Sequence, residues 1–482
     1  MIFLIIVPCI LCCVYAWRRR KKNLEGKLPP IYSGAWPFVG HIHLWFRGCK
    51  YLFWPRLLDM QRDCLDQGGV TYIYSGTNSA YTYYALADPS DCAKVANNCN
   101  KKFFPLEETI KAIFEDGLAT AADPVWEKRR NLLEPMFDQI SARLDVVNQH
   151  AKKLAGELAP KVQNGFFDPI KILQNTIMGI LLRTIYGAIE DKEQDSYKIA
   201  LQEISDVVYE RHRSFLKHNK LVFRWSNLKR RQDELVRTLK ALTNEVNMDS
   251  GMDPYLWFLF SEPITLLDRF LRLENKGVYS EQNVVDEVNG FLFGGYNTMV
   301  NSLQFILVMI GSYAAVQECI YTEIYNILSD SIREVNTEDL NNFIYLHAVI
   351  IEVLRLYPAV TKVSRKTQSS VDLKKYTIDP GTNCLLFIYA MNRHKSWGAD
   401  RDEFKPERWL GGSTDFNIAT FGLGRRSCIG MQLALNTMKI ILIYLLREYK
   451  VIADHTKLVL KQELMLTPES GYYIALEKRQ RS

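Results

Sequence analysis

The segment Phe421-Gly422-Leu423-Gly424-Arg425-Arg426-Ser427-Cys428-Ile429-Gly430 decides how this sequence is interpreted. Its three glycines allow tight turns in which the backbone passes close to a large flat ligand. Cys428 directly precedes a run with helical periodicity, 431–447, and a helix N-terminus stabilises a thiolate through its dipole and free amides. Arg426 lies two residues before the cysteine and could meet an anion. The alternative interpretation is a glycine-rich loop with an incidental buried cysteine.

The same segment resembles the haem-binding signature of the cytochromes P-450, F-x-x-G-x-R-x-C-x-G, at every fixed position. The resemblance implies a haem b cofactor with Cys428 as the axial ligand of its iron and Phe421 beside the ring. A thiolate ligand pushes electron density onto the iron, which favours cleavage of the O–O bond.

Three charged residues match further family segments that hold the haem side of the core together. Glu352 and Arg355 form the E-x-x-R pair, and their i, i+3 spacing places them on one helix face. Segment 404–409 resembles F-x-P-E-R-[FW], whose arginine, here Arg408, joins that pair. These charges are interpreted as structural. The same spacing recurs at 127–130, 210–213 and 234–237, where a solvated helix face is the better interpretation.

Segment 126–130 resembles the W-x-x-x-R helix that meets the haem propionates. Two carboxylates that enter a protein need cationic or N–H partners. The resemblance therefore makes Trp126, Arg130 and Arg426 candidates for binding the cofactor, with Lys362, seven residues after Arg355, as a weaker one. For Trp126 the alternative is core packing.

The oxygen-activating helix is expected at 284–312, with Ser280 and Glu281 forming its start. Its centre, 294–299, resembles the family pattern [AG]-G-x-[DE]-T-[TS]. Gly294 and Gly295 would open space for O2, and Thr298 would hydrogen-bond the oxygen undergoing activation.

Asn297 replaces the family's acid and Met299 the last hydroxyl. Asparagine has no titratable proton, so proton delivery must use water or run slowly. The alternative is a plain core helix. Other segments resemble the microsomal family-4 clan, particularly its arthropod members, several of which esterify a glutamate to haem. Because Gly294 stands at that position here, non-covalent haem is expected.

The N-terminus predicts a membrane anchor. Residues 1–17 carry no charge and five basic residues follow at once, in 18–22. As a helix this run rises roughly 25 Å, enough for a thin endoplasmic-reticulum bilayer. A cleaved signal peptide would place its charges first. The positive-inside rule then leaves the protein body on the cytoplasmic side.

The expected organisation is a transmembrane helix, 1–17, a basic and proline-rich connector, 18–40, and one haem-thiolate domain, 41–482. The fold class is mainly α with a minor β-sheet, the cytochrome P-450 fold. Short strands are expected at 50–100 and 365–390, helices at 105–360 and 431–447, and a hairpin at 469–471.

The residues favour an enzyme over a nucleic-acid-binding protein, because the net charge of +6 is diffuse and no basic stripe occurs. The first hypothesis is a monooxygenase that hydroxylates a lipophilic substrate such as a fatty acid, another lipid or a xenobiotic. The resemblance implies electrons from a separate NADPH-dependent cytochrome P-450 reductase, with cytochrome b5 as a second donor. The alternatives are a haem-thiolate protein that acts on peroxides or preoxidised substrates, and a membrane-tethered haem or lipid-binding protein without turnover.

Overall fold

The computed structural model describes residues 28–36, 40–41, 53–74, 82–102, 106–187, 191–249, 265–329, 333–411 and 418–480. The expected transmembrane helix, 1–17, and the connector up to residue 27 lie outside these ranges.

Helices form most of the described chain, as the periodicity predicted. Their bounds are α3 Phe53–Asp66, α4 Pro89–Asn98, α5 Leu106–Phe114, α6 Val125–Ser141, α7 Asp145–Leu158, α8 Ile170–Tyr186, α9 Asp191–Arg213, α10 Lys220–Arg224, α11 Asn227–Asp249, α12 Leu266–Asn275, α13 Glu281–Ser312, α14 Ala314–Leu328, α15 Thr337–Asn342, α16 Ile344–Leu356, α17 Ile388–Met391 and α18 Met431–Glu448.

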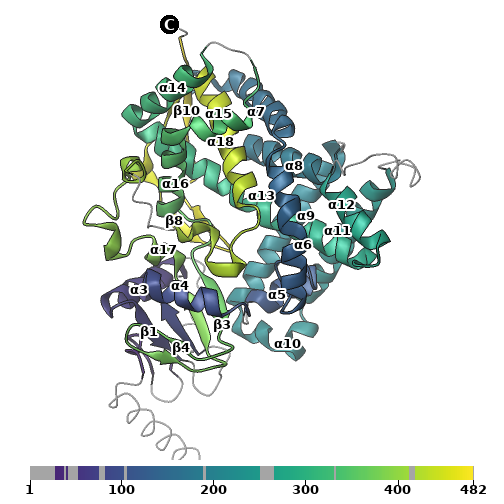
Figure 1. Ribbon diagram of the computed structural model, residues 1–482, viewed down its shortest axis with the longest axis vertical. Coiled ribbons are helices and arrows are strands. Elements are labelled where there is room, and N and C mark those ends of the chain that lie inside the picture. The colour runs from purple at the N-terminus through teal and green to yellow at the C-terminus, as the bar shows by residue number, and fades with distance from the viewer. Residues whose placement is uncertain are drawn as a thin grey trace, which may run out of the picture.

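The strands are short and gather into one four-stranded sheet, β1-β2-β6-β3, and three two-stranded sheets. Strands β1 and β2 run antiparallel, β2 and β6 parallel, and β6 and β3 antiparallel. The larger sheet lies with α3 and α4 at the lower end of the molecule in Figure 1, and the helical layers fill the rest. The bounds are β1 Val70–Ile73, β2 Tyr83–Leu86, β3 Val363–Lys366, β4 Val371–Asp372, β5 Thr377–Ile378, β6 Asn383–Leu386, β7 Tyr449–Ile452, β8 Leu460–Gln462, β9 Leu466–Pro468 and β10 Ala475–Lys478.

Helix α13 crosses the middle of the molecule and packs against α8, α12, α16 and α18 (Figure 1). It begins where the sequence predicted, because the Ser280 hydroxyl accepts the N–H of Asn283 and the Asn283 side chain accepts the N–H of Ser280. Most of its side chains are buried. Within the described ranges, no single helix is long and apolar enough to cross a membrane; α13 and α14 meet the criterion only as a pair, which is bent by 106°.

Two local expectations were wrong. The region 50–100 holds helices α3 and α4 besides its two strands. The expected hairpin at 469–471 is not one: β9 pairs with β8 before it, and β10 pairs with the distant β7. The turn signal itself is real, because Gly471 has a φ of +82°, in the left-handed region. Tertiary packing determines which strands pair, and a local turn signal does not contain that information.

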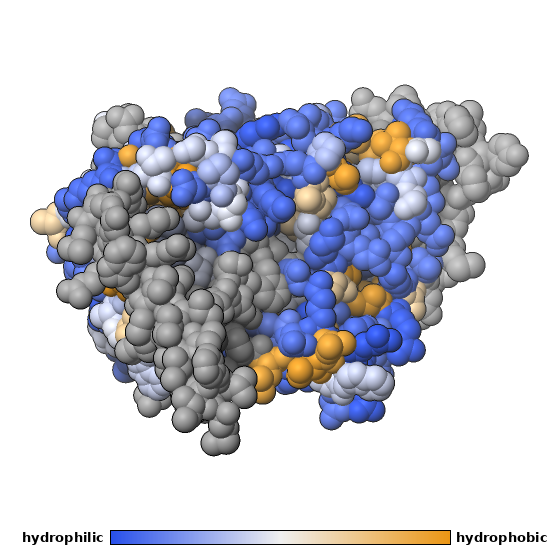
Figure 2. Space-filling model, turned by 90° about the horizontal axis from the view of Figure 1, so that it is seen from below, coloured by the Kyte–Doolittle hydropathy of each residue, from blue (hydrophilic) through white to orange (hydrophobic). Residues whose placement is uncertain are grey.

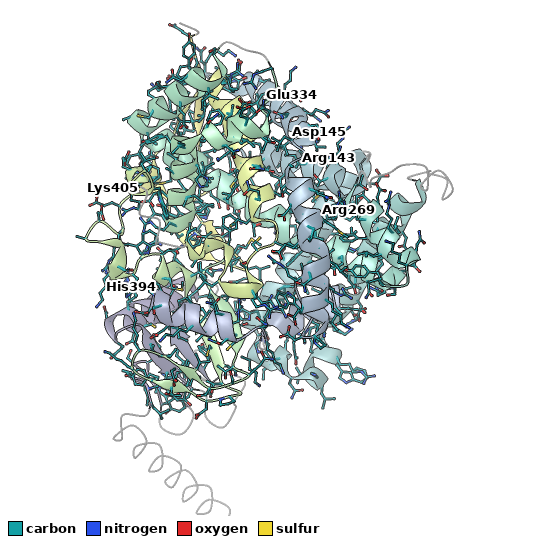
Figure 3. The ribbon with its side chains drawn as sticks, viewed as in Figure 1. Arg143, Asp145, Arg269, Glu334, His394 and Lys405 are labelled. Atoms are coloured by element: carbon teal, nitrogen blue, oxygen red, sulfur yellow. The ribbon has the colours of Figure 1, made fainter. Side chains whose placement is uncertain are left out.

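A buried carboxylate organises the side of the molecule where Figure 3 labels Lys405. Both oxygens of Glu352 accept hydrogen bonds from Arg355, at 2.8 and 2.9 Å, and Arg408 adds a third at 2.9 Å. The N–H of Lys405 and the indole of Trp409 complete the set, each at 3.0 Å. The structure thus confirms that the three predicted charges meet.

The environment of Glu352 decides its ionisation. Burial alone would raise the pKa of this carboxyl, but the hydrogen bonds from Arg355 and the charges around it lower the pKa below its ordinary value. Arg355 is equally well satisfied, since its Nη1 also donates to the carbonyls of Asn392 and Arg401 at 2.7 and 2.6 Å. The group therefore stays charged although its side chains are fully buried.

Another buried ion pair joins α6 to α13. Arg129 Nη1 lies 2.8 Å from Glu287 Oε1, and the Leu118 N–H donates to the other oxygen at 2.9 Å. The adjacent Asp286 is buried as well, but its Oδ2 has no hydrogen-bond partner among the described residues. Burial raises the pKa of Asp286 to about 7, although its hydrogen bond from Gln282 opposes the shift. Asp286 is therefore a buried acid that titrates near neutrality.

We expect Glu352→Gln to lower the free energy of unfolding by about 3–5 kcal/mol, because it leaves the fully buried Arg355 guanidinium without its counter-charge. The control is Glu157→Gln, whose pair with Lys153 spans 3.8 Å at the surface and contributes at most about 1 kcal/mol. Urea unfolding of both variants measures the difference. Equal losses would contradict a structural role for the buried network.

Asp286→Asn should change how stability depends on pH. The folded state holds this proton up to about pH 7, whereas an unfolded aspartate releases it near pH 4, so the wild-type free energy of unfolding falls as pH rises between those values. The variant lacks this loss. Its stability relative to wild type should therefore grow by about 1–3 kcal/mol between pH 5 and 7. A difference that stays constant with pH would refute the titration.

Candidate functional site

The cysteine loop is held in shape by two glycines with left-handed backbone. Gly422 has a φ of +81° and Gly424 a φ of +66°. A Cβ atom on Gly424 would lie 2.5 Å from the carbonyl oxygen of Ala96 in α4, so no other residue fits there. The Cys428 N–H donates to the Phe421 carbonyl at 2.7 Å, which closes the loop.

Cys428 lies three residues before α18, whose N-cap is Gly430. Its side chain is exposed, yet protein atoms surround the thiol closely enough for burial to raise its pKa. The Gly430 N–H and the charge of Arg130 act in the opposite direction. The sulfur therefore faces an internal opening. Among the described residues, no group of three or more His, Cys, Asp or Glu side chains is placed to hold a metal ion. A metal at Cys428 would need its other ligands from a cofactor.

Cationic side chains surround this loop, as the sequence predicted for two of them, Arg130 and Arg426. The guanidinium carbon of Arg426 lies 4.1 Å from the centre of the Trp126 ring. Its Nη2 donates to the Ala121 carbonyl at 2.7 Å, while its buried Nε has no hydrogen-bond partner in the part of the chain that the structure describes. Burial lowers the pKa of Arg426 to about 10. Arg130 donates to the Ser427 carbonyl at 2.7 Å.

The structure adds Arg365 of β3 to this cluster, which sequence reasoning missed. Its Nη2 donates to the Leu423 carbonyl at 3.3 Å, and its charge lowers the pKa of Arg426 further. The weaker candidate, Lys362, lies elsewhere, with its Nζ 5.3 Å from the centre of the Phe53 ring. Residues an odd number apart on an extended chain point to opposite sides. If the sequence had located strand β3, this rule would have placed Lys362 and Arg365 on opposite sides of the chain.

Helix α13 has open space on one face. A Cβ atom added to Gly290 or Gly294 would meet nothing within 4 Å, whereas one on Gly295 would lie 3.1 Å from Leu181 of α8. Of the two glycines expected to open space, Gly294 does so, whereas the expectation for Gly295 is wrong because Gly295 lets two helices pack closely. The Thr298 hydroxyl donates to the carbonyl of Gly294 at 2.7 Å and of Gly295 at 3.2 Å.

Asn297 links α13 to α9. Its Nδ2 donates to the Ser205 hydroxyl at 3.0 Å, and that hydroxyl donates in turn to the Leu201 carbonyl at 2.9 Å. One helical turn later, Asn301 contacts the C-terminal segments, with its Nδ2 3.8 Å from Met465 Sδ. Neighbouring elements thus hold both asparagines.

Comparison with known proteins identifies this arrangement. The family model for cytochrome P450 matches residues 31–476. The chain therefore belongs to the cytochrome P450 family of haem-thiolate monooxygenases, which bind haem iron as their cofactor.

Relatives with family-4 names confirm the predicted resemblance to that clan. "Cytochrome P450 4V2" of Rattus norvegicus is 27% identical over 75% of this chain and 74% of its own length. "Cytochrome P450 4d8" of Drosophila melanogaster is 27% identical over 78% and 87%, and its "Cytochrome P450 4c3" is 24% identical over 98% and 93%. The crystal structure of a cytochrome P450, 18% identical, superimposes with a TM-score of 0.79 over 94% of this chain and 99% of the other. That likeness confirms the fold.

The residues around the loop fit a haem group. A thiol open to the interior can meet the iron, and a buried guanidinium with an unpartnered N–H next to a second cation suits a carboxylate. Glycines without neighbours leave room beside α13. Without a bound cofactor, each of these features either lowers the stability of the fold or has no structural explanation.

Proposed function

We propose that Cys428 is the axial ligand of a non-covalently bound haem b and that the chain uses it to hydroxylate lipophilic substrates. The observation that carries the proposal is the accessible thiol of Cys428, whose loop lies beside the half-buried cations Arg130 and Arg426. Trp126, Arg130 and Arg426 would bind the propionates, and Phe421 would lie beside the ring. Arg365 joins this set. The haem stays non-covalent because residue 294, a glycine, offers no carboxylate.

When bound, haem supplies the iron at which O2 is reduced and cleaved, with electrons that we assign to a separate NADPH-dependent reductase or to cytochrome b5. The chain supplies the surroundings. Thr298 donates its hydroxyl proton to backbone carbonyls and keeps its oxygen free to accept another hydrogen bond. Asn297 has no proton to release, so a water molecule must deliver protons on this side of the helix.

We propose that residues 1–17 anchor the protein in the endoplasmic-reticulum membrane by a single pass. Residues 18–40 would connect this anchor to the catalytic domain. Residues 41–482 would form that domain on the cytoplasmic side. The described surface supports a membrane near α10. Leu216, Leu221, Val222 and Trp225 are exposed, Trp225 by 84%, and apolar patches appear on the face shown in Figure 2. Helix α10 and strand β1, to which residue 31 pairs, both lie at the lower end of Figure 1. Residue 31 therefore lies at the same end of the molecule as α10.

A second function is favoured by one contact. The Asn297 amide donates to Ser205 instead of presenting an acid, which suits a protein that turns over peroxides or preoxidised substrates, for which proton delivery is unneeded. Binding of haem or lipid without turnover is the remaining alternative. With NADPH, reductase and O2, a monooxygenase yields product and water, whereas impaired activation yields mainly hydrogen peroxide. Added peroxide then separates a peroxide-dependent enzyme, which turns over, from a binding protein, which does not.

The CO difference spectrum of the reduced protein tests the thiolate directly. We expect a strongly red-shifted Soret band for wild type, because thiolate donation shifts the band, and loss of this band in Cys428→Ala. Cys319→Ala, which removes an exposed thiol on α14, should keep the band. A red-shifted band in Cys428→Ala, or none in haem-loaded wild type, would refute the assignment.

Haem retention should distinguish the two basic residues at β3. Arg365→Met removes a cation beside the cysteine loop and should weaken haem binding about tenfold, the effect of losing a charge-assisted hydrogen bond. Lys362→Met should retain haem as wild type does, because Lys362 lies against Phe53. The Soret-to-280 nm absorbance ratio after gel filtration measures retention, with circular dichroism as the control for folding. Greater loss in Lys362→Met would restore the original candidate.

A further inference from the structure

One row of positions on α13 lacks side chains in its middle. Residues four apart are neighbours on a helix surface and normally form a ridge. The row in question consists of Asp286, Gly290, Gly294 and Thr298. A Cβ atom on either glycine would meet nothing within 4 Å. The row is therefore a groove, roughly 18 Å long, that runs from a buried acid to the hydroxyl expected to act in O2 activation.

This groove is accessible although α13 lies inside the molecule. Gly294 is exposed, and Gly290 and Thr298 are half-buried. Leu292 and Tyr296, on other faces of the same turns, are 0% and 1% exposed. The Thr298 hydroxyl donates its proton to the Gly294 carbonyl at 2.7 Å, so its oxygen can accept a hydrogen bond from water in the groove.

Asp286 forms the other end of the groove and is suited to carry a proton. Its side chain is 3% exposed. Its Oδ1 accepts a hydrogen bond from Gln282 at 2.7 Å, while its Oδ2 is buried and has no partner within the described ranges. An oxygen in this position fits a protonated carboxyl better than a carboxylate. The pKa of about 7, raised mainly by burial, agrees with this.

Charged groups from three neighbouring segments face Asp286. Glu115, directly after α5, raises the pKa of Asp286, whereas Lys240 of α11 and Arg129 of α6 lower it. Arg129 is held by Glu287, the next residue on α13, at 2.8 Å. Lys240 is thus the nearest cation that is not already bound to a buried carboxylate of α13.

The same groups connect Asp286 with the surface. Lys240 Nζ donates to the side-chain oxygen of Gln282 at 2.7 Å and lies 3.7 Å from Glu115. The side chains of Lys240 and Glu115 are 36% and 54% exposed. Bulk water is therefore close to Asp286 on the side away from the groove, and a proton that Asp286 loses can be restored from there.

We propose that Asp286 supplies protons for O2 reduction through water in this groove, in place of the family's acid that Asn297 replaces. Asn297 itself is turned toward Ser205 of α9. The inference rests on the proposed function, because it names the proton source of the same monooxygenase reaction. Asp286 acts through water and does not touch the reacting atoms, so it is a positioning residue for the proton.

The proposed step is balanced. In one turnover the substrate and O2, with two electrons from the NADPH-dependent donor and two protons, give the hydroxylated product and one water. Asp286 passes each proton from its carboxyl group to water in the groove and regains one from bulk water on the side of Lys240. The residue is unchanged at the end of the cycle.

The rate of O2 consumption by the haem-loaded full-length protein with NADPH and reductase tests the proposal. The wild-type rate should fall as pH rises through about 7, because only the protonated carboxyl can donate. Asp286→Asn keeps the shape and the contact with Gln282 but has no proton to give. Its rate should be on the order of 100-fold lower, without the fall near pH 7. Turnover driven by added peroxide, which brings its own protons, should be equal in both proteins.

Closing the groove should have the same effect as removing the acid. Gly290→Leu places a side chain where a Cβ atom meets nothing within 4 Å, so it should lower the O2 consumption rate and leave peroxide-driven turnover unchanged. Gly156→Leu is the matched control, because a Cβ atom on this glycine of α7 also meets nothing within 4 Å. This variant should consume O2 as wild type does.

Infrared absorption gives a measurement without turnover. The C=O stretch of a buried protonated carboxyl should disappear as pH rises through about 7 and be absent from Asp286→Asn. Lack of a titrating band, an unchanged rate in Asp286→Asn, or equal rates in Gly290→Leu and Gly156→Leu would overturn the proposal. If wild type consumed no O2, the proposed function would fail together with this inference, whereas the other outcomes leave the proposed function intact.

Discussion

The hydrogen bonds around the buried Glu352 carboxylate are the constraint on which the cysteine loop depends. Arg355 donates to the Asn392 carbonyl at 2.7 Å, and the Asn392 amide returns a bond to the Arg355 carbonyl at 3.0 Å. Asn392 also donates to the Thr420 hydroxyl, which donates to the Leu354 carbonyl at 2.7 Å. Thr420 directly precedes Phe421, whose carbonyl accepts the N–H of Cys428. The ion pair therefore positions the cysteine through a chain of fully satisfied groups.

Buried guanidinium groups in the described part of the chain differ in what they meet. Arg129 of α6 pairs with Glu287 of α13, and Arg355 pairs with Glu352 within α16. Arg426 pairs with no carboxylate among the described residues, and its buried Nε has no hydrogen-bond partner there. Because an unpaired buried charge costs several kcal/mol, an anion bound beside Arg426 would stabilise this arrangement.

Sequence reasoning succeeded where the information is local. The i, i+3 spacing of Glu352 and Arg355, the cap at Ser280 and the glycine-rich loop before Cys428 are determined within a few residues. It failed where a distant element decides. Gly294 and Gly295 are adjacent glycines, and only the position of α8 shows which one faces open space. Similarly, the strand register that turns Arg365 toward the cysteine loop comes from its pairing with β6.

The asparagine in the reactive helix fits its surroundings in a way that an acid would not. Ser205 already donates its only proton to the Leu201 carbonyl, so its oxygen is available as an acceptor for the Asn297 amide. A carboxylate at position 297 would face the lone pairs of that oxygen unless Ser205 gave up its own bond. With Asn297 in place of the family's acid, the helix loses a proton donor and gains a hydrogen bond between α13 and α9. This hydrogen bond ties α9 directly to the helix beside the haem site.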